Sequence, residues 1–326
     1  MNRLFILALV LLASISTAEA RNIRVLILDD VFQKIPPKDE ALEDMGKLRG
    51  DLLVNGVHYS GNIQVLKGKE SLYIINELPF EDYVKHVVSA EVGSNWDMEA
   101  LKVQAVISRT YALYHKKKNG IRGSYDLTSS VLHQVYKGSS FDARIAYAVI
   151  QTESEVLTYD GDLIEAFYHS TAGGRTEDPA EVFGRSYPYL RPVKSSCEIS
   201  PYWIWERRIP ADEIAKALAL KGISDIKIKT YTTTERVKTV DIISGGEILN
   251  IETKNLRRIL GWRRLPSTNF TVRTENGDFI FEGKGYGHGV GLCQWSALEM
   301  SRKGMSYRSI LEYFYPGTKL EKYEDR

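Results

Sequence analysis

The 326-residue sequence lacks an excess of charge of either sign, and it lacks a long apolar run. Its 43 basic and 42 acidic residues nearly cancel, so no basic field would draw the chain onto nucleic acid. No segment beyond the N-terminus approaches the roughly 20 apolar residues that a membrane-spanning helix requires. We therefore expect neither nucleic-acid binding nor a transmembrane segment in the mature chain.

A short apolar run does occur at the N-terminus. Arg3 precedes the apolar stretch Leu4–Ala13, and small residues follow at Ala18-Glu19-Ala20. This order is typical of a cleavable secretory signal, and the apolar stretch is too short for a membrane anchor. The sequence therefore predicts a signal peptide at residues 1–20 and export of residues 21–326.

Cysteine is scarce as well, because Cys197 and Cys293 are the only two. No C-x-x-C or H-x-x-H spacing is present, which argues against a zinc site. We expect no metal ion and no cofactor. An oxidising compartment would allow the two cysteines to form a disulfide, whereas two buried free thiols are the equal alternative.

Changes of hydrophobic period divide the mature chain into strand-rich and helix-rich stretches. A polar loop is expected at 36–44, and turn signals stand at Asn55-Gly56 and Ser60-Gly61. The expected strands are 22–29, 51–54, 64–66, 72–75, 156–158, 163–169, 226–230, 237–243 and two within 270–281. The expected helices are 79–91, 95–118, 210–221, 294–303 and 307–315. Because strands and helices are segregated, we expect an α+β fold with mainly antiparallel strands and a buried helix pair.

The helix expected from Pro79 to Glu91 carries the most informative pattern. Its apolar residues recur at the spacing of one helix face, namely Phe80, Tyr83, Val84, Val87 and Val88. Glu91 continues the same row and therefore faces the core. Desolvation raises the pKa of a carboxyl group, as a general acid requires. The structural alternative is an ion pair, for which Arg109 is the obvious partner.

The next helix is apolar on nearly all sides, which indicates burial. Four polar residues interrupt it, namely Gln104, Ser108, Arg109 and Thr110. Buried polar groups must find hydrogen-bond partners. We expect those partners to be either other protein groups or a substrate.

Several blocks then occur in a fixed order. The first runs from Glu77 to Val84, continues at Ser89-Ala90-Glu91 and extends over Glu99–Tyr111. It is followed by Gln134-Val135-Tyr136, by Tyr168–Thr176 with the pattern H-S-x-x-G-G, and by Gly285–Trp295 with the pattern G-H-G-V-G-x-x-Q-W. Together they resemble the SpoIID/LytB family, which includes stage II sporulation protein D and the amidase enhancers. The resemblance covers roughly Val25 to Leu320.

This resemblance implies a peptidoglycan lytic transglycosylase in the periplasm or the cell-wall space, with Glu91 as its catalytic acid and base. It also implies a strand-rich part at about 22–78, a catalytic core at about 79–195 and 282–320, and an inserted α/β part at about 198–281. Glycines in the later blocks allow either close approach to a ligand or tight turns. The substrate-binding residues expected along a glycan groove are Arg109, Gln134, Tyr136, His169, Ser170, Gly173, Gly174, His288, Gly289 and Gln294.

The chain departs from the family in three places, one of which is Ala172, where some relatives have cysteine in the H-S-x-x-G-G block. Some members carry a Cys/His metal cluster just before Q-x-Y, but residues 125–133 here contain one histidine and no cysteine. Gly93 stands where the family usually has proline after the glutamate. The alternative function is a non-catalytic glycan-binding enhancer of a cell-wall amidase. The expected partners are therefore peptidoglycan glycan strands and, under the alternative, an amidase.

Overall fold

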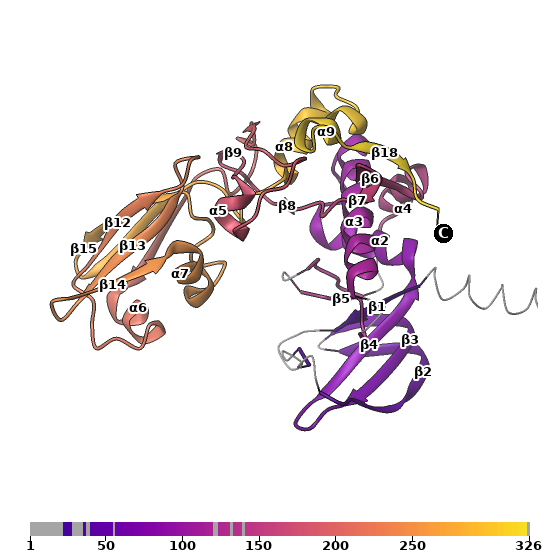
Figure 1. Cartoon of the computed structure of the whole chain (residues 1–326), viewed down its shortest axis with the longest axis horizontal. Coiled ribbons are helices and arrows are strands. Elements are labelled where there is room, and N and C mark those ends of the chain that lie inside the picture. The colour runs from indigo at the N-terminus through magenta and orange to yellow at the C-terminus, as the bar shows by residue number, and fades with distance from the viewer. Residues whose placement is uncertain are drawn as a thin grey trace, which may run out of the picture. The chain divides into compact units, whose positions relative to one another are not determined.

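A computed structural model describes residues 22–27, 35–36, 40–54, 56–119, 123–130, 133–138 and 141–324. The predicted signal peptide lies outside the described residues. The chain divides into a first unit, which comprises the described residues up to Glu165 and from Lys319 onward, and a second unit, Ala166–Thr318. Both units combine helices with small, mostly antiparallel sheets, so the predicted α+β class is confirmed (Figure 1).

The first unit contains a five-stranded sheet in the order β2-β3-β4-β1-β5. Its strands are β1 (Asn22–Leu26), β2 (Glu43–Val54), β3 (Val57–Lys67), β4 (Leu72–Pro79) and β5 (Leu127–Thr128). All neighbours are antiparallel except β1 and β5, which are parallel. Strands β2, β3 and β4 are longer than predicted, and Glu43-Asp44 belongs to β2 and not to a loop. Strand β1 ends at Leu26, and positions 28–29 of the strand predicted at 22–29 lie outside the described residues.

The turn predicted at Ser60-Gly61 is wrong, because both residues lie inside β3. Gly61 pairs with Gly50 of β2 and has a φ of 110°. A Cβ atom at Gly61 would lie 2.8 Å from the carbonyl oxygen of Glu77. Glycine is therefore required here for close packing of backbone within the sheet, which local sequence does not distinguish from a turn.

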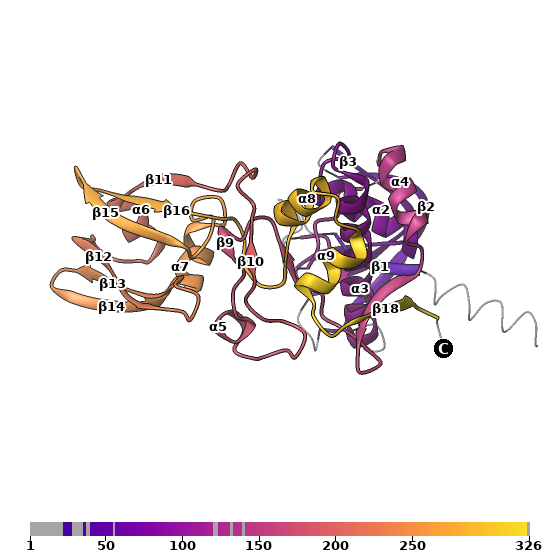
Figure 2. The same cartoon turned by 90° about the horizontal axis from the view of Figure 1, so that it is seen from above.

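The first unit also contains three helices and a second sheet. The helices are α2 (Phe80–Glu91), α3 (Met98–Asn119) and α4 (Ala143–Gln151). The sheet has the order β18-β6-β7, formed by β6 (Glu155–Tyr159), β7 (Asp162–Leu163) and β18 (Lys319–Lys322). Helix α3 contacts α2, α4 and β6, so it is the central element, and Figures 1 and 2 show α2, α3 and α4 gathered at one end of the large sheet.

The second unit is built on two three-stranded sheets. One has the order β11-β16-β15, from β11 (Trp205–Pro210), β15 (Phe270–Glu275) and β16 (Asp278–Gly283). The other has the order β12-β13-β14, from β12 (Asp225–Tyr231), β13 (Val237–Ser244) and β14 (Glu247–Glu252). Helices α6 (Ala211–Ala217) and α7 (Thr253–Leu260) contribute Ile214 and Leu256 to the apolar core of these sheets.

Short strands and helices carry the two glycine-rich blocks of this unit. Two strand pairs join β8 (Tyr168–His169) with β17 (Leu292–Cys293) and β9 (Gly174–Arg175) with β10 (Lys194–Ser195). The remaining helices are α5 (Pro179–Phe183), α8 (Gln294–Arg302) and α9 (Tyr307–Phe314). The single strand predicted at 163–169 is wrong, because residues 164–167 are irregular and separate β7 from β8. No helix within the described ranges is long and apolar enough to span a membrane.

Candidate active site and glycine-rich blocks

Glu91 is the last residue of α2. The apolar residues that precede it on the same face are fully buried, including Tyr83, Val87 and Val88. Glu91 itself is half-buried. Helix α2 ends here because Val92 is extended, with a φ of −135°. The Glu91 carboxyl therefore stands at the margin between core and solvent.

The backbone N–H of Val135 donates a 3.0 Å hydrogen bond to Oε1 of Glu91. The residues on either side of Val135 are buried. Gln134 accepts from the Tyr83 hydroxyl at 3.1 Å, and Tyr136 donates to Oδ1 of Asn76 at 2.6 Å. The Q-x-Y block thus has a clear geometric meaning, because its two polar side chains anchor a backbone segment whose N–H meets the glutamate.

Arg109 binds Glu81 and not Glu91. Its Nε and Nη2 each donate to a Glu81 carboxylate oxygen at 2.8 Å, and its Nη1 donates to the carbonyl of Glu155. Arg109 is 1% exposed. The ion pair considered from the sequence is therefore formed with another glutamate of the same helix. Direct substrate contact by Arg109 would require these bonds to break, and it stays a prediction.

The other polar residues of α3 also have protein partners. Gln104 donates to the Ser108 hydroxyl at 3.0 Å. Gln134 donates to the Ser108 carbonyl, so Ser108 links the helix to the Q-x-Y block. The Thr110 hydroxyl donates to Val106 and accepts from Leu157 N–H. The polar side chains of α3 were expected to bind either other protein groups or a substrate, and the bonds in the structure are to protein groups.

In the second unit, His169 and His288 lie close together, with ring centroids 5.6 Å apart. The backbone of Val290 orients both, because its carbonyl lies 3.1 Å from Nδ1 of His169 and its N–H donates to Nδ1 of His288 at 3.0 Å. A carbonyl only accepts, so Nδ1 of His169 carries the proton. Nε2 of His169 is then an acceptor, and it is buried without a hydrogen-bond partner among the residues that the structure describes.

Both histidines are neutral near pH 7. Burial lowers the pKa of His169 well below its usual value, and the neighbouring His288 acts in the same direction. Burial and the Arg257 charge lower the pKa of His288 to about 4. Neutral imidazoles can donate or accept hydrogen bonds to sugar hydroxyls. Among the described residues, no cluster of three or more His, Cys, Asp or Glu side chains could hold a metal ion.

The glycine-rich blocks pack against one another. Gly285, Gly287 and Gly291 all have positive φ, from 73° to 114°. A Cβ atom at Gly285 would lie 2.6 Å from the Thr171 carbonyl oxygen, and one at Gly291 would lie 2.0 Å from the Phe167 carbonyl oxygen. These glycines therefore let the G-H-G-V-G block approach the protein's own H-S-x-x-G-G block, so the close approach they permit is to protein backbone.

Gly289 faces a buried ion pair that the sequence did not indicate. A Cβ atom there would lie 2.9 Å from Cζ of Arg236. Arg236 is 2% exposed, its Nε lies 3.7 Å from a carboxylate oxygen of Glu177, and its Nη2 donates to the Ala172 carbonyl at 2.5 Å. No local pattern marks Arg236, since it follows an ordinary turn in a strand-rich stretch.

The remaining predicted contacts of this unit lie beside the same blocks. The Ser170 carbonyl accepts from Trp295 N–H at 3.2 Å, and the Ser170 hydroxyl lies 3.3 Å from that of Thr171. Gln294 begins α8 and is 6% exposed. Ser170 therefore has the more accessible side chain of the two predicted contacts.

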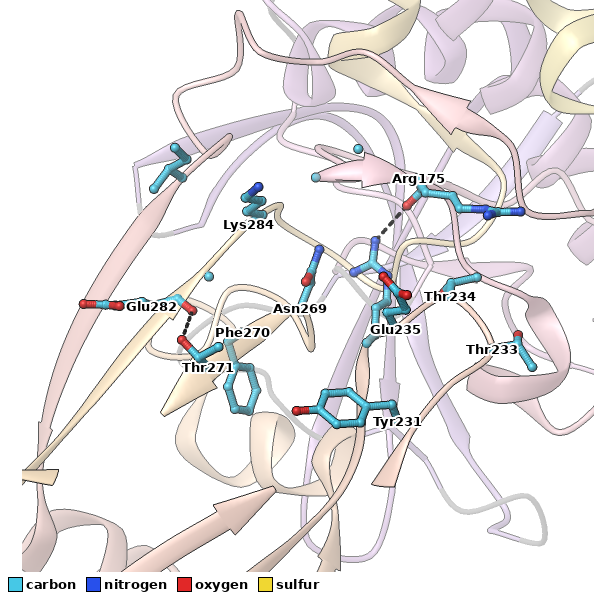
Figure 3. Close-up of a pocket in the computed structure, with 15 residues that line it drawn as sticks. Arg175, Tyr231, Thr233, Thr234, Glu235, Asn269, Phe270, Thr271, Glu282 and Lys284 are labelled. Carbon is cyan, nitrogen blue, oxygen red and sulfur yellow. Dashed lines mark hydrogen bonds between the residues drawn. The ribbon is translucent and has the colours of Figure 1, made fainter. Parts of the chain in front are cut away.

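The second unit also contains a cavity of ≈ 640 Å³. Gly173 and Gly174 line it, so two predicted substrate contacts border this space. Figure 3 shows Asn269 and Tyr231 among the side chains around it, whereas the Arg175 guanidinium extends away from the other lining residues. An aromatic ring and an amide are groups that bind sugar faces and hydroxyls.

Comparison with known proteins identifies the family. The model of the family Stage II sporulation protein matches residues 68–159, and a Domain of unknown function (DUF8618) matches residues 195–291. Stage II sporulation protein D of Bacillus subtilis is 32% identical over 267 residues, which cover 76% of this chain and 75% of that protein. An uncharacterized protein of Brachyspira hyodysenteriae is 33% identical over 279 residues, covering 83% and 74%.

The Amidase enhancer of Bacillus subtilis is 29% identical over 291 residues, which cover 74% of this chain and 40% of that protein. The chain belongs to the SpoIID/LytB family. The Stage II sporulation match contains Glu91, Arg109 and the Q-x-Y block, whereas the second match contains Arg236 and the histidine His288.

Proposed function

We propose that this protein is exported and cleaves peptidoglycan glycan strands as a lytic transglycosylase, with Glu91 as the acid and then the base. The observation that carries the proposal is the position of Glu91. Its carboxyl stands at the half-buried end of an otherwise buried helix face, and the Val135 N–H holds one of its oxygens. The proposed location is the periplasm or the cell-wall space, after removal of residues 1–20.

The proposed reaction needs one carboxyl group. Protonated Glu91 donates its proton to the glycosidic oxygen between N-acetylmuramic acid and N-acetylglucosamine, and the bond from that oxygen to C1 breaks. The muramoyl 6-hydroxyl then bonds to C1, and its proton passes to the Glu91 carboxylate. A 1,6-anhydro end forms and Glu91 is protonated again. A hydrolase would require a second carboxyl group to activate water.

The Val135 hydrogen bond supports both halves of this cycle. An N–H donor stabilises a carboxylate, so it stabilises Glu91 after proton donation. It also restricts rotation of the carboxyl group, which keeps the acidic oxygen oriented. Gln134 and Tyr136 supply this N–H by anchoring its segment, and their bonds in the structure favour that positioning role. Their direct contact with sugar stays a prediction.

In the second unit we propose that the strand contacts the region of His169, Ser170, His288, Gly289 and Gln294, together with the cavity at Gly173 and Gly174. The neutral histidines and the Asn269 amide suit hydroxyl and N-acetyl groups. The proposed division into a strand-rich part, a core and an inserted part follows the blocks named from the sequence.

A second function is favoured by one comparison, the similarity to a protein named Amidase enhancer. In that function the chain binds glycan or an amidase and cleaves nothing. Mass spectrometry of glycan strands without stem peptides, after incubation with the mature protein, separates the two. The transglycosylase proposal expects 1,6-anhydro-muramic ends. If no such ends appear and a cell-wall amidase is accelerated, the enhancer function replaces it.

A further inference from the structure

Cys197 and Cys293 come from distant parts of the sequence but lie side by side in the second unit. Cys197 follows β10, and Cys293 ends β17. Both are fully buried free thiols, and each shifts the pKa of the other, so the two side chains are neighbours. Neither cysteine belongs to the residues through which the proposed reaction proceeds.

Hydrogen bonds place both sulfur atoms beside the H-S-x-x-G-G block. Sγ of Cys293 accepts from the Ala172 N–H at 3.2 Å and donates to the Ser170 carbonyl at 3.5 Å. Sγ of Cys197 donates to the Ser195 carbonyl at 3.4 Å, and Ser195 pairs with Gly174 of that block across β10 and β9. The sulfurs therefore share one small polar pocket of the H-S-x-x-G-G block.

The two thiols differ in acidity. The neighbouring Cys293 side chain, together with the backbone N–H groups of Ala172, Gly173 and Gly174, lowers the pKa of Cys197 to about 7 against the opposing effect of burial. Burial raises the pKa of Cys293 well above its usual value. The guanidinium of Arg236 lies within electrostatic range of both sulfurs. Since the thiolate is the reactive form, Cys197 is the member of the pair that reacts first.

We propose that Cys197 and Cys293 form a disulfide in the exported protein. The co-reactant is a disulfide oxidant such as oxidised glutathione. The Cys197 thiolate attacks one sulfur of the oxidant and releases the other as a thiolate. Cys293 then loses its proton and attacks Cys197, which releases the second thiol. Two protein thiols are oxidised to one disulfide, and one oxidant disulfide is reduced to two thiols.

The cross-link would join the segment after β10 to the end of the G-H-G-V-G-x-x-Q-W block. Cys293 pairs with His169 across β17 and β8, and Gln294 follows it directly. The disulfide would therefore fix two of the proposed glycan contacts to a third segment of the chain. The inference rests on the proposed export, since an oxidising compartment is where such a bond persists.

The first experiment uses the full mature chain, purified reduced and then exposed to oxidised glutathione. Free thiols are blocked in denaturant, and the protein is digested without reductant and examined by mass spectrometry. We expect one peptide pair that links Cys197 to Cys293, with no blocked thiol. Recovery of both cysteines as blocked thiols overturns the proposal. This arm does not depend on export or on glycan cleavage, so its failure is distinguishable from failure of the proposed function.

The second experiment compares Cys197→Ser, Cys293→Ser and the double variant by thermal unfolding with and without reductant. If the disulfide forms, reductant should lower the unfolding midpoint of the oxidised wild type and leave the midpoints of all three variants unchanged. It also predicts that each single variant loses about as much as the double variant, because either removes the same bond. Additive losses with no response of the wild type to reductant would indicate two packed thiols and would overturn the proposal.

Discussion

Replacing Glu91 with glutamine should abolish glycan cleavage while leaving the fold intact. Glutamine retains an oxygen that can accept the Val135 N–H now bound at 3.0 Å. Because the proposed resting form of Glu91 is the neutral acid, this exchange keeps a neutral hydrogen-bond acceptor, and we expect it to cost no more than about 1 kcal/mol of folding free energy. Loss of the transferable proton should lower the rate by roughly 10²–10⁴-fold, which corresponds to about 3–5 kcal/mol in the barrier.

Glu81→Gln is the matched control on the same helix. Glu81 is 29% exposed and neutralises Arg109, whose side chain is 1% exposed. Half of a partly buried ion pair would remain, so we expect a loss of about 1–3 kcal/mol after allowance for solvent screening. The midpoint of thermal unfolding should fall by about 2–4 °C per kcal/mol. Specific activity well below that midpoint should be retained.

The assay for both variants is the rate of 1,6-anhydro-muramic ends released from glycan strands without stem peptides, measured beside a thermal unfolding curve. The expected pattern is opposite in the two variants, with activity lost in one and stability lost in the other. A Glu91→Gln protein that is folded and cleaves within about threefold of the wild-type rate would refute a proton-transfer role worth 10²–10⁴-fold.

Two further predictions concern the second unit. Gly291→Ala would place a Cβ atom 2.0 Å from the Phe167 carbonyl oxygen, so its thermal unfolding midpoint should fall well below that of Gly277→Ala. The control has a similar positive φ but meets open space, so it suffers only the backbone strain of about 1–2 kcal/mol. Equal losses of stability in the two variants would contradict the close packing at Gly291. Because the pKa of His288 is lowered to about 4, the unfolded chain binds more protons between pH 4 and 6.5, so stability rises with pH there and is lost as pH falls. Denaturant titrations at several pH values give the slope of the free energy of unfolding against pH. That slope should be smaller in His288→Gln than in the wild type by up to about 1.4 kcal/mol per pH unit, and identical slopes would contradict a lowered pKa of His288.

The helix periodicity was sufficient to single out Glu91. The row from Phe80 to Val88 repeats at the helical spacing, and every apolar member of it is buried in the structure. Helices α8 and α9 were predicted with ends within one residue of those observed, because polar or Pro-Gly signals bound them. Periodicity works in these places because a helix buries whichever face its own side chains make apolar.

Several elements were missed for a common reason. Helix α4 was not predicted, although Ile145, Ala148 and Val149 form its buried face. The strand at Leu163–His169 was predicted as continuous, but residues 164–167 are irregular and only their two ends bond to neighbouring strands, Ile164 to Leu157 and Phe167 to Leu292. A short apolar run does not reveal where its partner strand ends, and pairing with a distant strand decides whether it is extended.

The sequence alone determined the α+β class, the family and the glutamate that interrupts an apolar helix face, because composition, period and motif order are properties of the chain itself. Only the tertiary structure decided that Val135 N–H binds Glu91, that Arg109 binds Glu81, and that the two cysteines meet. Each of those contacts joins residues that are far apart in the sequence. Their meeting depends on how strands and helices cross in space, which no local spacing of residues encodes.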